Sequence, residues 1–134
     1  MKKLFYILLI LSFYNCKNSL DLGSGYFVHS TQMGCRAIGK DFSWNVKSNP
    51  VFGHVTEYAV DDKFIIAKRV NQDSLMARLN LAKRSWKKLD QLAQNFTAEY
   101  YIINKQVDST FGPLTKSQYS ILKKKLKINK SLEI

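Results

Sequence analysis

Apolar and polar side chains alternate along much of the first half of the chain, with the two-residue period of a β-strand. Residues 26–31 are rich in aromatic and β-branched side chains and predict a first strand. Residues 35–40 and 42–46 predict two short extended segments, and in the second every other side chain is apolar. This half of the chain is therefore expected to be mostly β.

A hairpin is the clearest local feature of the pattern. Two apolar-rich runs, residues 51–60 and 63–70, are separated by Asp61 and Asp62. Aspartate favours turns because its short side chain hydrogen-bonds the local backbone. Residues 64–67 are continuously apolar, which predicts a central strand covered on both faces. Residues 99–106 return to a strand pattern.

A helical pattern lies between these strands, after Asp73 or Ser74, either of which would cap a helix. Apolar residues then recur at alternating spacings of four and three, as on one face of a helix. The stripe comprises Leu75, Leu79, Ala82, Trp86, Leu89, Ala93 and Phe96. It predicts one long helix that packs on a sheet, and a coiled-coil seam is the alternative that this repeat allows.

A shorter helix is predicted near the end of the chain. Residues 107–112 are expected to form a loop, Thr115 is a good N-cap, and the helix runs from Lys116 to about Lys127. Its buried stripe is Tyr119, Leu122 and Leu126. The order of elements predicts an α+β fold, a mostly antiparallel sheet with one long and one short C-terminal helix packed on one face.

The length of 134 residues, with 46% hydrophobic and 23% charged residues, indicates one globular domain and excludes a disordered tail or a multi-domain enzyme. The chain opens with Lys2 and Lys3 and continues with an apolar run over residues 4–11, the pattern of a secretory signal. Extended to Tyr14, this segment is roughly 16 Å long as a helix, about half of the ~30 Å hydrocarbon core of a membrane. It is too short to span.

Cys16 follows the apolar run directly and precedes the polar residues 17–19. An ordinary cleavage site with small residues is missing, since the first alanine is Ala37. The segment resembles a bacterial lipoprotein signal, which implies an acylated Cys16. It departs from the usual pattern at Phe13 and Asn15, where Leu and a small residue are more common.

The expected organisation is a signal peptide over residues 1–15, a lipidated cysteine and spacer over residues 16–24, and a single α+β domain over residues 25–134. Acyl chains on Cys16 would bind membrane lipid, because each buried methylene contributes about 0.8 kcal/mol. The protein is expected in the cell envelope, lipid-anchored to a bacterial membrane, with its domain outside the cytoplasm.

The second cysteine, Cys35, is then a lone thiol and is expected to be a buried small hydrophobe. An unmodified Cys16 could instead form a disulfide with Cys35. A zinc site needs three or four ligands at regular spacing, and the chain offers only His29, His54 and Cys35 besides its acids. We therefore assign no catalytic residue, no metal and no cofactor. An envelope hydrolase that uses His29, His54 and Cys35 is the alternative.

The net charge of +11 is concentrated in lysines, and only four of the 21 basic residues are arginines. One cluster lies in the long predicted helix, and a second lies at residues 123–130. A solvated helix face and a surface that binds anionic lipid both fit these clusters. An exported protein rarely meets nucleic acid, so nucleic-acid binding is not expected.

Three segments carry a family resemblance: FIIAK at residues 64–68, YYIINK at residues 100–105 and FGPLT at residues 111–115. They resemble a family of small uncharacterised bacterial lipoproteins with the motifs IIAK, YYIIDK and GPLT. The likeness covers about residues 25–126 and implies no activity. Asn104 stands where that family more often has aspartate.

The signal segment and the lack of catalytic motifs favour a binding or interaction module with a protein partner in the envelope. An inhibitor or immunity protein that neutralises an exported toxin is one form of such a module. The sequence leaves the partner unidentified.

Overall fold

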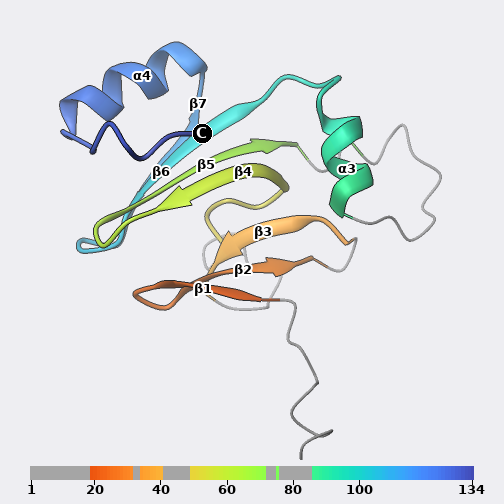
Figure 1. Ribbon diagram of the computed structural model, residues 1–134, viewed down its shortest axis with the longest axis horizontal. Coiled ribbons are helices and arrows are strands. Elements are labelled where there is room, and N and C mark those ends of the chain that lie inside the picture. The colour runs from red at the N-terminus through yellow and green to blue at the C-terminus, as the bar shows by residue number, and fades with distance from the viewer. Residues whose placement is uncertain (1–18, 32–33, 41–48, 72–74, 76–85) are drawn as a thin grey trace, which may run out of the picture.

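Two antiparallel sheets and two helices make up the fold in the computed structural model, which describes residues 19–31, 34–40, 49–71, 75 and 86–134 (Figure 1). The three-stranded sheet has the order β1 (Leu20–Gly23), β2 (Tyr26–Ser30) and β3 (Arg36–Gly39). The four-stranded sheet has the order β4 (His54–Val60), β5 (Phe64–Val70), β6 (Glu99–Asn104) and β7 (Ser109–Leu114). The helices are α3 (Trp86–Ala93) and α4 (Lys116–Lys125). The predicted α+β class is confirmed.

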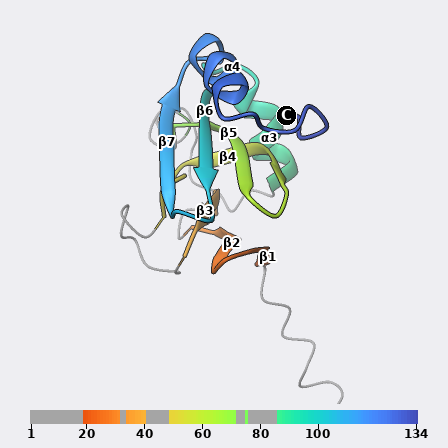
Figure 2. The same cartoon turned by 90° about the vertical axis from the view of Figure 1, so that its left-hand side faces the viewer.

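The four-stranded sheet is the middle layer of the fold, between the three-stranded sheet and α4 (Figures 1 and 2). Along β5, Ile65 and Ala67 pack toward the three-stranded sheet, whereas Phe64 and Ile66 pack toward α4. All four side chains are buried. The predicted hairpin of β4 and β5 and the covered central strand are thus both confirmed.

The strands form two sheets rather than the one expected. Between β3 and β4 the only ladder contact in the described part is an isolated bridge from Ile38 to Val51. The chain then turns at Gly53, whose φ is +150° and where a Cβ would lie 2.9 Å from the carbonyl oxygen of Val70. This position therefore needs glycine, and the strand that follows it, β4, pairs with β5.

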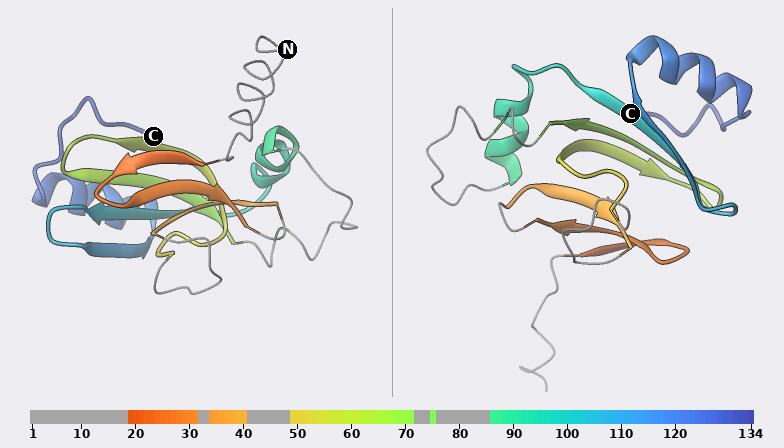
Figure 3. Two further views of the ribbon diagram at one scale, coloured as in Figure 1. Left: turned by 90° about the horizontal axis from the view of Figure 1, so that it is seen from below. Right: turned by 180° about the vertical axis from the view of Figure 1, so that it is seen from behind.

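The helices do not share a face, contrary to the expectation. α4 covers the outer face of the four-stranded sheet, and α3 lies toward the other end of the fold, beside β4 (Figure 3). Leu89 and Ala93 of α3 pack with Val70 and Leu75. The described part of the predicted long helix ends at Ala93, before Phe96. Its first part, residues 72–74 and 76–85, lies outside the described residues, as do the predicted strand at 42–46 and residues 1–18.

Two predicted boundaries are wrong. Residues 20–23, expected in the spacer, form β1, which pairs with β2 and buries Leu22. Residues 109–114 form β7, although most of this segment was expected to be a loop. Gly112 and Pro113 sit opposite Tyr101 in a bulge of this outer strand. Proline is tolerated in such a bulge because its missing N–H is not needed by the ladder.

Candidate functional site

A groove of about 680 Å³ lies between α4, the chain that follows it and the outer face of the four-stranded sheet. We call it the lysine groove. Its lining residues are Glu57, Lys68, Tyr100, Lys116, Tyr119, Ser120, Lys123, Lys124, Lys127, Ile128, Lys130, Glu133 and Ile134. A groove of this volume is in the range that binds small molecules or the anchoring segment of a larger ligand.

Helix α4 begins where it does because Thr115 and Gln118 form a capping box. The Gln118 backbone N–H donates to Thr115 Oγ1 over 3.2 Å, and the Thr115 N–H donates to Gln118 Oε1 over 2.9 Å. Three lysines occupy the last turn, where positive charge suits the helix dipole. The predicted N-cap is confirmed.

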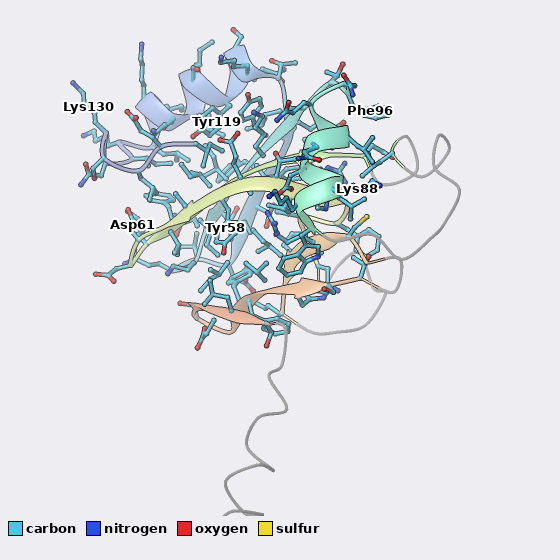
Figure 4. The ribbon with its side chains drawn as sticks, turned by 45° about the vertical axis from the view of Figure 1, so that its right-hand side comes forward. Tyr58, Asp61, Lys88, Phe96, Tyr119 and Lys130 are labelled. Carbon is cyan, nitrogen blue, oxygen red and sulfur yellow. The ribbon has the colours of Figure 1, made fainter. Side chains whose placement is uncertain are left out.

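The chain reverses after α4 and returns along the sheet. Lys127 has a φ of +54°, and the Ile128 N–H donates to the carbonyl of Lys123 over 3.1 Å. Ile128 and Leu132 are then buried against the sheet with Phe64. This reversal gives the groove its second wall and carries Lys130 to its rim (Figure 4).

Two tyrosines form the floor of the lysine groove. The ring of Tyr119 on α4 stacks on that of Tyr100 on β6, with centroids 5.0 Å apart and planes inclined by 26°. Tyr119 is 7% exposed, and its buried hydroxyl has no hydrogen-bond partner within the described residues. Burial raises the pKa of Tyr119, so the hydroxyl keeps its proton and can donate a hydrogen bond.

The rim of the groove is strongly positive. It carries six lysines against two glutamates. Lys68 pairs with Glu57 at 3.1 Å, and Lys123 donates to the carbonyl of Leu132. The other four ammonium groups make no ion pair within the described part of the chain: Lys116, Lys124, Lys127 and Lys130. Such a concentration of one charge attracts anions.

A second polar cluster surrounds His54, which is fully buried at the start of β4. The backbone N–H of Arg36 donates to His54 Nδ1 over 3.2 Å, so the ring proton belongs on Nε2, which lies 2.8 Å from Asp90 Oδ1. Burial lowers the pKa of His54 and opposes the pull of Asp90 toward the charged form. His54 is thus a neutral donor to Asp90.

Arg36 completes this cluster. Its Nη2 lies 3.3 Å from Asp90 Oδ2, its Nη1 donates to the Val55 carbonyl over 3.0 Å, and its guanidinium lies 4.6 Å from the centre of the Trp86 ring. The Trp86 indole donates to the carbonyl of Gly34 over 3.0 Å. These contacts join α3 to β3 and β4.

The three residues of the hydrolase alternative lie in three different environments. His29 is 2% exposed, with Nε2 2.8 Å from Asn49 Oδ1, while His54 bonds to Asp90. Cys35 is a free thiol at 0% exposure, and burial raises its pKa to about 11. Cys35 directly precedes Arg36, whose N–H bonds to His54, but the three side chains form no metal-binding cluster within the described residues. Cys16 lies outside the described residues.

No cluster of three or more metal-ligating side chains is found in the part of the chain that the structure describes. Among the described helices, none is long and apolar enough to cross a membrane.

The C-terminal lysines and the buried Tyr119 could be predicted from the sequence, but their neighbours Tyr100, Lys68 and Glu57 could not. These residues come from β4, β5 and β6, far from α4 along the chain. Asp90 was also missed, because a lone aspartate on a helix carries no local sign of its partners.

Comparison with known proteins gives one match. Residues 23–134 match the family described as "Protein of unknown function (DUF3997)". No curated protein and no solved structure matches the chain. Because the match spans most of its length, the chain belongs to the DUF3997 family of proteins of unknown function.

Proposed function

We propose that this protein is a lipid-anchored binding module of the bacterial envelope. Acyl chains on Cys16 hold it to the membrane, the domain lies outside the cytoplasm, and the lysine groove binds a protein partner. An inhibitor or immunity protein is one form that this activity can take. The observation that carries the proposal is that the lysine groove lies on the face of the four-stranded sheet opposite to β1. Figure 1 shows α4, which forms one wall of the groove, on that face.

The lipid anchor would hold β1 close to the membrane. A fully extended chain from Cys16 to Leu20 spans at most about 14 Å, so β1 stays near the membrane. Each packed layer adds about 10 Å, and the middle sheet separates β1 from α4. The floor of the groove is therefore about 10 Å and its α4 wall about 20 Å from the three-stranded sheet, which exceeds the ~8 Å Debye length at physiological salt. This arrangement supports a partner in solution over binding of the lysines to the anchoring leaflet.

The burial of Cys35 and His54 supports a binding function rather than hydrolysis. The thiol of Cys35 and the ring of His54 are both at 0% exposure, whereas a nucleophile and its base must reach the substrate. The lysine groove, in contrast, is open and carries four lysines that make no ion pair within the described residues.

The anchor is tested by intact-mass analysis of protein extracted from membranes, with sequencing of the N-terminal peptide. We expect a chain that begins at Cys16 and carries added acyl mass. Cys16→Ser should lose that mass and leave the membrane fraction, whereas Cys35→Ser should keep it. A chain that retains residues 1–15 with an unmodified Cys16 would refute the anchor.

A further inference from the structure

We propose that the lysine groove binds an extended acidic segment of a protein partner, with carboxylates on the lysines and one apolar or aromatic side chain on the tyrosine floor. The inference rests on the proposed binding function and names the chemistry of its partner.

The free lysines form a long row rather than a point. Lys116 and Lys124 lie eight positions apart on α4, which separates them by about 12 Å along the helix axis. Four residues of extended polypeptide span about 13 Å, since a strand rises ~3.3 Å per residue. Lys127 and Lys130 continue the rim beyond the helix. The row is too long for one carboxylate and suits a segment with several.

The floor of the lysine groove favours an apolar contact rather than a charged one. Tyr100 and Tyr119 present stacked rings beside Ile128, an apolar surface between charged walls. The Tyr119 hydroxyl is buried and has no hydrogen-bond partner within the described residues, and a buried hydroxyl without a partner is unfavourable. A peptide segment supplies both requirements, because it has a side chain for the rings and a carbonyl or carboxylate oxygen as acceptor.

Two observations favour a peptide over a phosphate-bearing ligand. Helix N-termini bind phosphate through free N–H groups, but the capping box of Thr115 and Gln118 already satisfies two of the N–H groups at the start of α4. Among the described residues, no arginine, with its bidentate fork for phosphate, lines the groove. The remaining recognition is by flexible point charges on lysine, which adapt to carboxylates spread along a chain.

The test measures binding of a fluorescent peptide with alternating glutamate and leucine to the full chain in detergent, by anisotropy. The glutamine version of the peptide serves as the uncharged probe. We expect the acidic peptide to bind, the glutamine peptide to bind roughly tenfold more weakly or not at all, and salt to weaken the binding.

Matched variants locate the binding. Lys124→Glu, at an exposed lysine of the groove, should weaken binding roughly tenfold, whereas Lys87→Glu, at an exposed lysine of α3, should leave it within about twofold. Tyr119→Phe removes only the orphan hydroxyl and should weaken binding several-fold without lowering the unfolding midpoint. Circular dichroism establishes that each variant is folded.

The inference is overturned if Lys124→Glu and Lys87→Glu weaken the peptide equally, or if the peptide does not bind. It is also overturned if inorganic phosphate or vesicles of phosphatidylglycerol displace the peptide at lower concentration than free glutamate-rich peptide does. Acylation of Cys16 is tested independently, by intact mass. A negative peptide-binding result therefore argues against the acidic ligand and leaves the lipid anchor unaffected.

Discussion

Nε2 of His54 lies 2.8 Å from Oδ1 of Asp90, and this contact joins the first residue of β4 to the middle of α3. Arg36 bonds to the other carboxylate oxygen of Asp90. One aspartate thus serves a neutral ring and a cation at the same time. The position of α3 depends on this carboxylate as well as on the apolar contacts of Leu89 and Ala93.

We expect Asp90→Ala to lower the free energy of unfolding by about 1–3 kcal/mol, because His54 and Arg36 both lose their acceptor. The Asp90 side chain is 37% exposed, so water replaces part of the loss. Urea unfolding followed by circular dichroism measures the change. Asp62→Ala, at an exposed residue of the β4–β5 turn, should change stability by less than about 0.5 kcal/mol. Equal effects of the two substitutions would contradict the role of Asp90.

Stability should fall as the pH decreases below about 6.5, the ordinary pKa of histidine. Burial lowers the pKa of His54 in the folded state, with Arg36 adding to this and Asp90 opposing it. The unfolded chain therefore takes up the proton at a higher pH than the folded chain, and acid favours unfolding. Urea midpoints measured between pH 8 and pH 5 should show this slope, and His54→Gln should flatten it. An unchanged slope in His54→Gln would assign the effect to other groups.

Gly112→Ala should destabilise the domain by about 2–3 kcal/mol. The φ of Gly112 is +151°, and a Cβ there would lie 2.3 Å from Cδ1 of Tyr101, so the ring or the strand must move. Gly25→Ala provides a control with φ +80° and no atom within 4 Å, where only the backbone cost of about 1–2 kcal/mol applies. Thermal unfolding compares the two. A larger loss in Gly25→Ala would mean that the contact with Tyr101 is unimportant.

Cys35 should resist alkylation in the folded protein. Its thiol is buried, and burial raises its pKa to about 11, so very little thiolate forms at neutral pH. We expect iodoacetamide at pH 7.5 to leave the Cys35 peptide unmodified until urea is added, as read by peptide mass spectrometry. Fast modification of the native protein would restore thiol chemistry as an explanation of its activity.

Local features could be predicted from the sequence because their causes are local. The side chain of Asp61 accepts from the N–H groups of Lys63 and Phe64, which is the turn chemistry that its presence between two apolar runs predicts. Thr115 caps α4 for the same kind of reason. The apolar run of β5 predicts a strand buried on both faces, whichever layers cover it.

The predictions that were wrong concern features that depend on residues distant in the sequence. β7 was missed because glycine and proline usually mark a loop, whereas here the ring of Tyr101 and the edge position make a bulge favourable. The split into two sheets depends on the turn at Gly53 against Val70. The lysine groove joins α4 to Tyr100 and Lys68, and no spacing along the chain indicates that contact.

The bulge at Gly112 and Pro113 also bears on how copies of this protein meet one another. An outer strand with a regular row of N–H and C=O groups is a template for a strand from a second molecule, and such pairing begins many aggregates. In β7 the row is interrupted, because Pro113 has no N–H and the bulge breaks the regular spacing. The edge of β7 should therefore disfavour strand pairing between neighbouring molecules, even at high local concentration. We expect the four-stranded sheet not to extend into a second molecule through β7.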